Sequence, residues 1–374
     1  MRLARLFAVA RKEVIQIRRD PRSLAMAFVI PMILLFLFGY ALTLDVDDLT
    51  TIVYDQDRTA ASREFLARFE ESGYFRVVAH AEAYGDLERA IDAGRAQVGL
   101  VVPTGFARDL DRDRRVPVQA ILDGSDSNTA TIAIAYLEGI AGRYSDELVT
   151  ARVGLGAREP PVESRLRVWY NPEIESKNYI VPGLIAVIMM VIAALLTSLT
   201  IAREWERGTM EQLVATPVRV PELVLGKLLP YFGIGLVDVA LAVLASTLVF
   251  RVPLRGNVVL LLGLSLVFLL GALSLGLLIS IRAKSQLVAS QVAMVVTFLP
   301  SFLLSGFMYD IGNMPGWLQT VTYAFPARYF VTILKGIYLK GVGPPALVVE
   351  AAFLALFALA VTAAALRAFR KNLE

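Results

Sequence analysis

The chain has 374 residues, of which 56% are hydrophobic and 19% are charged, a composition too apolar for one soluble globule. The absence of cysteine excludes disulfides, thiolate metal sites and cysteine nucleophiles, and the single histidine, His80, argues against a histidine-based metal site or triad. The net charge of +3 could indicate nucleic acid binding, but the basic residues lie beside apolar segments. This placement fits anionic lipid headgroups and membrane orientation better.

Residues 1–23 form a basic amphipathic segment. Apolar residues recur there at steps of three and four, and arginine and lysine occupy most of the other positions. The pattern predicts an interfacial helix ahead of the first transmembrane segment. The alternative is the n-region of a signal peptide, which is disfavoured because both the basic stretch and the apolar run after it are too long.

Residues 24–44 form the first predicted transmembrane helix, since about 20 apolar residues cross a hydrocarbon core of about 30 Å. The composition then turns soluble over residues 45–178, where β-rich runs alternate with helix-like runs. This alternation predicts a small α/β domain, and roughly 130 residues are enough to bury a core. The domain contains no dinucleotide-binding glycine motif, P-loop or H-E-x-x-H motif.

A second apolar block covers residues 179–366. It contains five further runs long enough to cross a membrane, at residues 180–202, 228–250, 258–281, 287–307 and 347–366. The predicted fold is therefore an α-helical polytopic membrane protein, with six transmembrane helices and an α/β domain inserted between helices 1 and 2. Lysine and arginine concentrate in the short flanks on one side, which places both termini, including a tail at residues 367–374, in the cytoplasm and residues 45–178 outside.

Residues 309–343 match neither a full span nor a plain loop. The segment is interrupted by Pro315 and Pro326. It is predicted to be a re-entrant or interfacial segment on the outer side, with an aromatic belt formed by Trp317, Tyr323, Phe325, Tyr329 and Phe330. Two roles for this segment remain as alternatives: simple membrane anchoring, or a part in an outer gate.

Residues 203–227 separate two spans and are the most richly charged segment of the membrane half. Thr209 and Gln212 have the spacing of a capping box, and a glycine just ahead permits a tight turn. A short helix is therefore predicted to begin at Met210 and to end before Pro217. A helix of under two turns is marginal alone in water, so a docking partner on this face would explain it. The alternative is a solvated loop with helix-end charges.

Asp238 lies inside the third predicted span, where an unpaired charge costs on the order of 3 kcal/mol or more. A place in a translocation pathway, a structural hydrogen bond to a neighbouring helix and a misplaced span boundary are all open explanations. An intramembrane enzyme would need paired catalytic groups. Asp238 alone lies well inside a span, so acid–base catalysis is disfavoured and no catalytic residue is predicted.

The charged loop closely resembles the signature loop of the type-2 permeases of ATP-binding cassette (ABC) exporters. The residues that carry the resemblance are Arg203, Glu204, Glu206, Gly208, Thr209, Glu211, Leu213, Thr216, Pro217, Glu222, Gly226 and Lys227. The six-span layout, the large insert and the outer segment are also similar, most of all to bacterial multidrug or antibiotic exporters. The resemblance implies a permease subunit of the bacterial inner membrane that moves a hydrophobic or amphipathic substrate, such as a drug or lipid, out of the cytoplasm or inner leaflet.

The resemblance also implies partners. The loop would act as a coupling helix seated in a cytoplasmic ABC ATPase subunit, through Arg203, Glu204, Glu206, Arg207, Gly208, Thr209, Glu211, Thr216 and Pro217. A second permease, identical or paralogous, is expected, with a periplasmic adaptor as an optional partner, membrane lipid around the spans and no nucleic acid. The chain lacks a P-loop, because Gly226 and Lys227 are followed by Leu228. No cofactor is therefore expected on the chain, and ATP and Mg²⁺ would belong to the ATPase.

A membrane-anchored receptor or scaffold is the alternative from another functional class. Such a protein would use the α/β domain at residues 45–178 for binding and would need no coupling loop. The charged segment at residues 203–227 argues against this alternative.

Overall fold

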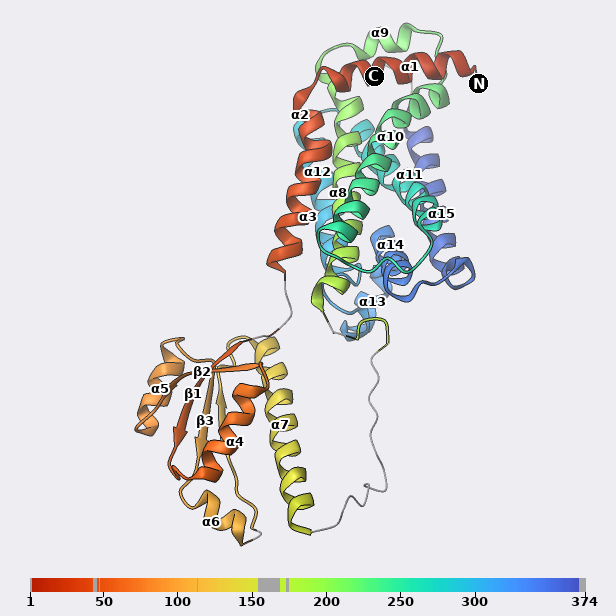
Figure 1. Cartoon of the computed structure of the whole chain (residues 1–374). Coiled ribbons are helices and arrows are strands. Elements are labelled where there is room, and N and C mark those ends of the chain that lie inside the picture. The colour runs from red at the N-terminus through yellow and green to blue at the C-terminus, as the bar shows by residue number, and fades with distance from the viewer. Residues whose placement is uncertain are drawn as a thin grey trace. The chain divides into compact units, whose positions relative to one another are not determined.

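The computed structural model describes residues 2–42, 46, 48–112, 114–153, 169–172 and 175–369. The chain divides into two compact units, one made of residues 1–43 with 167–374 and the other of residues 44–166. Figure 1 draws both units, and each has its own hydrophobic core.

The smaller unit is built on a four-stranded sheet in the order β2-β1-β3-β4. β1 pairs in parallel with β2 and with β3, and β4 runs antiparallel to β3. The strands are β1 (Leu49–Asp55), β2 (Phe75–His80), β3 (Val98–Val102) and β4 (Gln119–Leu122). The helices are α4 (Ala60–Glu71), α5 (Tyr84–Asp92), α6 (Phe106–Asp111) and α7 (Ser127–Val153). An α/β region follows the first apolar helix, as the alternating sequence pattern predicts.

Strand β3 is buried along its whole length because helices cover both faces of the sheet. Leu100 contributes to the core beneath α4, α6 and α7, whereas Val101 contributes to the core beneath α5. Successive side chains of a strand point to opposite faces. Because both faces are buried here, the sequence of β3 is a continuous apolar run. Gly99 allows a close approach, since a Cβ there would lie 2.5 Å from the side chain of Leu87 on α5.

The larger unit consists of helices. Within the described residues, five are long and apolar enough to cross a membrane. They are α8 (Ser176–Glu206), α10 (Val220–Leu248), α11 (Val258–Ala283), α12 (Gln286–Leu303) and Pro344–Ala368, which joins η4 (Pro344–Leu347) to α15 (Val348–Ala368). The first of the six expected spans corresponds to three consecutive elements: α2 (Pro21–Leu24), the π-helical η1 (Ala25–Val29) and α3 (Ile30–Ala41). Its apolar part, Ala25–Ala41, is shorter than each of the five long apolar helices.

Helix α8 is the central helix of this unit, and 89% of its most apolar segment is buried. Small residues let α11 approach it closely: a Cβ on Gly276 would lie 2.1 Å from the carbonyl oxygen of Ala194. Thr197 Oγ1 donates to the carbonyl of Leu273 at 2.8 Å, and Ser280 Oγ accepts from two backbone N–H groups of α8 at 2.9 Å. These contacts fix the end of α8 from which the charged loop departs.

Residues between α12 and α15 form η2 (Ile311–Asn313), α13 (Gly316–Thr322), α14 (Pro326–Lys335) and the π-helical η3 (Gly336–Lys340). Pro326 stands in the first turn of α14, where a missing N–H costs nothing. Trp317 and Tyr323 are exposed, as an aromatic belt requires. The belt prediction is wrong for Tyr329 and Phe330, which are buried, and the Phe330 ring stacks on Phe268 of α11 with centroids 4.0 Å apart.

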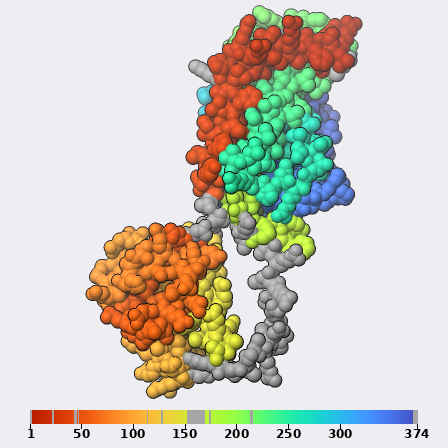
Figure 2. Space-filling model, viewed as in Figure 1, coloured from red at the N-terminus to blue at the C-terminus, as the bar shows by residue number. Residues whose placement is uncertain are grey.

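The N-terminal segment forms α1 (Leu3–Arg18), which lies across one end of the larger unit (Figure 2). Its apolar face buries Leu6, Ala10 and Ile17. The helix packs against the start of α10 and lies beside α9 (Met210–Ala215), the short helix of the charged loop (Figure 1). The predicted amphipathic helix is present, and it packs against the protein as well as presenting a basic face.

Candidate functional site

The charged segment at residues 203–227 contains the end of α8, a loop and the start of α10. Helix α8 continues through Glu206 and α10 begins at Val220, so residues 207–219 lie outside both long helices. Helix α9 begins at Met210 and ends at Ala215, which confirms the predicted short helix. Gly208 adopts a φ of +67°, the left-handed conformation that favours glycine and that turns the chain between α8 and α9.

Helix α9 is anchored on one side and exposed on the other. Met210 is buried in the core of the unit, whereas Glu211 and Gln212 are exposed. The Thr209 hydroxyl, expected to cap α9 in a box with Gln212, donates to the carboxylate of Glu204. The start of α9 is therefore attached directly to the last turn of α8.

A cluster of buried charges lies behind α9. Lys227 Nζ of α10 is 2.5 Å from Glu13 Oε1 of α1 and 3.5 Å from Glu204 Oε1 of α8. Lys12 of α1 also contacts Glu204. Glu13 and Lys227 are 1% exposed and Glu204 is 4% exposed, so each charge needs a partner to offset its desolvation. The cluster joins α1, α8 and α10 at one point.

Two further sets of contacts hold the ends of these helices. Arg203 Nη1 lies 3.0 Å from Asp20 Oδ2, just after α1. Glu206 accepts from the backbone N–H of Gln286 at 2.7 Å and from its side-chain amide at 2.5 Å, which satisfies the start of α12. The last turn of α8 thus makes polar contacts with the end of α1, the start of α9 and the start of α12.

The start of α1 is tied to the far end of the loop. Glu222 accepts from the backbone N–H of Arg219 at 2.9 Å, which caps α10, and from the backbone N–H of Arg2 at 2.7 Å. Arg5 Nη1 donates to the carbonyl of Pro217 at 2.5 Å. The start of α1 therefore supports the far end of the loop that carries α9.

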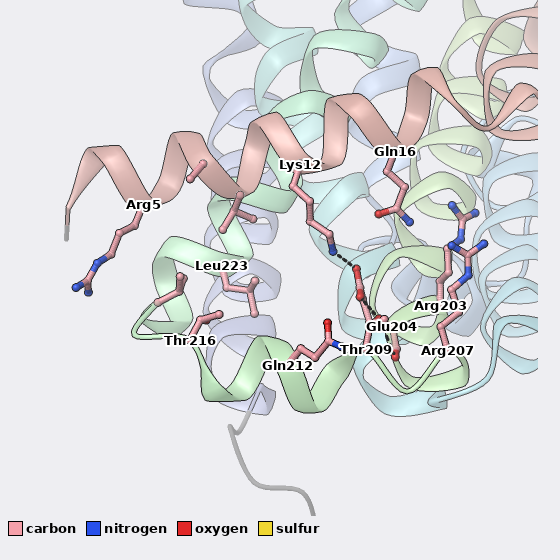
Figure 3. A pocket seen from close by; sticks show the side chains of 13 residues that line it. Arg5, Lys12, Gln16, Arg203, Glu204, Arg207, Thr209, Gln212, Thr216 and Leu223 are labelled. Carbon is pink, nitrogen blue, oxygen red and sulfur yellow. Dashed lines mark hydrogen bonds and ion pairs between the residues drawn. The ribbon is translucent and has the colours of Figure 1, made fainter.

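A cavity of about 490 Å³ lies between α1, α9 and the adjoining ends of α8 and α10 (Figure 3). Four cationic side chains reach it, two from α1, one from α8 and one from the residue after α8, together with apolar groups of α1 and α10. The lining residues are Arg5, Ala8, Val9, Lys12, Gln16, Arg203, Glu204, Arg207, Thr209, Gln212, Thr216, Val218 and Leu223. In Figure 3, Lys12 points from α1 towards Glu204.

The expected coupling residues divide into two groups. Arg203, Glu204 and Thr209 make the internal contacts described above. Glu206 also makes internal contacts, although it is exposed. The other residues are exposed along the loop and α9: Arg207, Gly208, Glu211, Thr216 and Pro217. The first group positions α9, and the second forms the surface that a partner could reach.

The sequence pattern did not predict a role for Lys12 or Glu13, and Lys227 entered only through the family resemblance and the absence of a P-loop. One signal for Glu13 was available. The buried positions of α1 are 6, 10, 13 and 17, so Glu13 interrupts an otherwise apolar helical stripe. A carboxylate on a buried stripe requires a cation nearby, and Lys227 supplies it.

Asp238 lies away from this site. It is 1% exposed within α10, eleven residues after Lys227, which corresponds to about 16 Å along the helix. Among the described residues, Asp238 Oδ1 has no hydrogen-bond partner. The structure does not bring Asp238 together with the loop residues.

The five long apolar helices, with an ordered surface helix at the end of the central one, define a polytopic membrane protein. The chain belongs to the family described as ABC-2 family transporter protein, which matches residues 21–367. The predicted resemblance to ABC type-2 permeases is therefore confirmed.

Three bacterial relatives place the chain within this family. It is 40% identical over 351 residues to the "Probable multidrug ABC transporter permease YbhS" of Escherichia coli, covering 94% of this chain and 92% of the relative. It is 34% identical over 338 residues to the "Probable multidrug ABC transporter permease YbhR" of the same organism, covering 90% of each chain. The "Inner membrane transport permease YhhJ" is 27% identical over 265 residues, covering 69% and 68%. This chain is accordingly a multi-pass membrane permease of the ABC-2 family.

Proposed function

We propose that this permease is the membrane subunit of an ATP-driven exporter in the bacterial inner membrane. It moves hydrophobic or amphipathic molecules, such as drugs or lipids, out of the cytoplasm or inner leaflet. A separate cytoplasmic ABC ATPase docks on α9. The observation that carries the proposal is the placement of α9, which is exposed on one side and attached through Thr209 and Glu204 to the central helix α8 on the other.

This placement gives a route from the docking surface to the membrane helices. A force on α9 acts on Glu204 through the Thr209 hydroxyl, and Glu204 is in turn paired with Lys227 of α10. Helix α8 packs against α11 and α12, so movement of its end is passed to the rest of the bundle. Short polar contacts between rigid helices suit this task better than a flexible loop would.

The chemistry of ATP hydrolysis belongs to the partner in this proposal. The permease has no P-loop, so the ATPase subunit would hold ATP and Mg²⁺. A second permease, identical or paralogous, would complete the pathway, and both termini would lie in the cytoplasm. A periplasmic adaptor is an optional partner.

Asp238 is the residue that we propose for the pathway. Its buried carboxylate has an oxygen without a hydrogen-bond partner among the described residues, within a helix long enough to span the membrane. Intramembrane acidic residues of this kind typically face a cavity or a partner group. A cationic amphipathic substrate would supply the missing charge during passage.

The proposal is tested by reconstituting the permease with its ATPase in inside-out vesicles and following uptake of a fluorescent cationic amphipathic dye. Uptake should require ATP and should stop when the P-loop lysine of the ATPase is replaced. Asp238→Asn should change the uptake rate at normal expression, because the amide keeps hydrogen bonding but removes the charge. Dye binding without ATP-dependent uptake would favour the receptor alternative, and unchanged rates in both Asp238→Asn and Asp238→Leu would remove Asp238 from the pathway.

A further inference from the structure

A second cavity, of about 820 Å³, lies where the end of α1, the start of the first apolar helix, the last turns of α8 and the start of α12 meet. It shares Lys12, Gln16, Arg203 and Arg207 with the cavity beside α9. The full lining is Lys12, Ile15, Gln16, Arg19, Asp20, Pro21, Met26, Leu199, Arg203, Arg207 and Gln286. Arg203 and Arg207 are also among the expected coupling residues, but the cavity itself has no role in the proposed transport function.

The lining changes from apolar to cationic along α8. Leu199 lies within the apolar part of the helix, Arg203 follows one turn later and Arg207 follows immediately after the helix ends. Each step of four residues advances about 6 Å. Met26, in the π-helical η1, also lies in an apolar membrane segment. The cavity therefore has an apolar end at the depth of the membrane segments and a cationic end at the level of the interfacial helix.

The cationic end of the cavity contains more cationic side chains than carboxylates. Lys12 is paired with Glu204, and Arg203 is paired with Asp20 at 3.0 Å. In the described part of the chain, no carboxylate forms an ion pair with Arg19 or Arg207, and both side chains are exposed. Two guanidinium groups thus remain available for an anion, and guanidinium favours phosphate because of its planar set of donors.

We infer that this cavity binds an anionic phospholipid. The headgroup phosphate is recognised by Arg19 and Arg207, and an acyl chain lies along the apolar end formed by Met26 and Leu199. Basic pockets between transmembrane helices on the cytoplasmic side are suited to anionic headgroups. An acidic peptide would satisfy the arginines but leave the apolar end unfilled, and a zwitterionic lipid would bring its own cation to a positively charged site.

The bound lipid would have a structural consequence for the larger unit. Arg19 follows α1, whereas Arg207 begins the loop that carries α9. A phosphate shared by the two would join these segments at the membrane surface. The inference does not depend on the proposed ATPase partner, because lipid binding is measured on the permease alone.

The test uses delipidated full-length permease in neutral detergent, titrated with phosphatidylglycerol and followed by native mass spectrometry. Each basic group near an anionic lipid surface contributes about a factor of five in affinity. The double variant Arg19→Gln/Arg207→Gln should therefore bind phosphatidylglycerol about thirty-fold more weakly. Arg11→Gln/Arg18→Gln is the matched control, since it removes the same charge from exposed positions of α1 that do not line the cavity.

Two further arms identify the ligand. Met26→Trp fills the apolar end without changing charge and should also weaken lipid binding, provided that its thermal unfolding matches that of wild type. Phosphatidylcholine should bind more weakly than phosphatidylglycerol, and inorganic phosphate should not displace the lipid because it lacks an acyl chain. Equal weakening in the Arg11→Gln/Arg18→Gln control, unchanged binding in Arg19→Gln/Arg207→Gln or in folded Met26→Trp, or displacement by inorganic phosphate would overturn the inference.

Discussion

Lys227 carries a charge at a position where only 1% of the residue is exposed. Its ammonium lies between two carboxylates, Glu13 and Glu204, that are themselves buried. Breaking a buried pair by removing one partner is costly, because the remaining charges keep their desolvation penalty without compensation. Lys227 is therefore the cation that compensates Glu13 at the contact between α1 and α10.

We expect Lys227→Met to destabilise the folded protein by on the order of 3–5 kcal/mol, because Glu13 is left buried without its cation. The additional change Glu13→Leu should recover part of this loss. The measurement is thermal unfolding of the purified permease, followed by tryptophan fluorescence. Lys177→Met serves as the control, since Lys177 pairs with Glu175 at 2.9 Å near the surface, where such pairs contribute about 1 kcal/mol or less. Similar losses in the control and in Lys227→Met would contradict the account.

Asp57 has a comparable role in the smaller unit, where it holds the start of α6. Its carboxylate accepts from the backbone N–H of Gly105 at 2.7 Å and of Ala107 at 3.0 Å, and from the Thr59 hydroxyl at 2.8 Å. The hydrogen bond from Ala107 is the main cause that lowers the pKa of Asp57 below its ordinary value, with smaller contributions from Thr59 and Gly105 and against the opposing effect of burial. Asp57 thus stabilises the unit in its ionised form.

This lowered pKa predicts an acid-sensitive contribution to stability. Above the unfolded pKa of about 4 the stabilisation is fully present, and it is lost as the pH falls through the lower folded pKa. Asp57→Asn should cost about 1 kcal/mol at neutral pH, as loss of a helix-capping group does, and should reduce the fall in stability below about pH 4. The fall in stability is measured by pepsin cleavage of the full-length protein between about pH 4.5 and 2.5. Asp111→Asn, at the exposed end of α6, is the control. An unchanged acid profile in Asp57→Asn would refute this assignment.

At the scale of elements, the charged segment at residues 203–227 contains one helix that the sequence predicts and two helix ends that it does not. Helix α9 is predictable because its signals are local: a glycine at the turn, the capping-box spacing of Thr209 and Gln212, and a proline after its end. The end of α8 and the start of α10 are less predictable. Charged residues such as Arg203 and Glu204 lower the local hydropathy although α8 continues through them. These charges are paired with residues of the N-terminal segment: Glu204 with Lys12 and Arg203 with Asp20. Lys227 likewise pairs with Glu13, which is 214 residues distant in sequence. The stripe of α1 can mark Glu13 as unusual, but no local pattern identifies a partner so far away in the chain.

The turn between α8 and α9 provides a test of the element itself. A Cβ at Gly208 would meet nothing within 4 Å, so the only obstacle to substitution is the φ of +67°. We expect Gly208→Val to cost about 1–2 kcal/mol and to displace α9, since β-branched residues disfavour this conformation. Gly208→Asn should be tolerated because asparagine adopts the left-handed region more readily. Co-purification of the ATPase with each variant is the measurement, and equal effects of asparagine and valine would show that the turn conformation is not what matters.

At the scale of the whole molecule, the expected α/β region and apolar helices are present, whereas the six-span count rests on the first apolar helix. Ala25–Ala41 alone measures about 25 Å, slightly less than a hydrocarbon core, but with the preceding α2 the helical path reaches about 31 Å. We therefore keep six spans as the proposal. An even number of spans places both termini on one side of the membrane.

This topology predicts which residues are labelled from outside the cell. Cysteine can be introduced singly because the chain has none. In spheroplasts, an impermeant thiol reagent should label Ser125→Cys in the α/β unit and should leave Gln212→Cys in α9 unlabelled until the membrane is opened. Both positions are exposed on the folded protein, so burial does not explain a difference. Labelling of Gln212→Cys alone in intact spheroplasts would reverse the proposed orientation.

The central claim is that α9 is the surface on which the ATPase docks. Glu211 is exposed in the first turn of this helix, where a carboxylate also suits the positive end of the helix dipole. Its reversal to lysine removes this interaction and would place a cation against the proposed ATPase surface where wild type presents an anion. A like-charge contact across an interface can cost several kcal/mol. Glu88→Lys is the matched control, because it reverses an exposed helical carboxylate in the α/β unit.

The most direct measurement is co-purification of the ATPase with wild-type permease, Glu211→Lys and Glu88→Lys, with ATP-dependent dye uptake followed in the same vesicles. We predict that Glu211→Lys inserts in the membrane at normal levels but loses both ATPase association and uptake, whereas Glu88→Lys keeps both. Wild-type association and uptake in Glu211→Lys would contradict the claim that α9 is the docking surface.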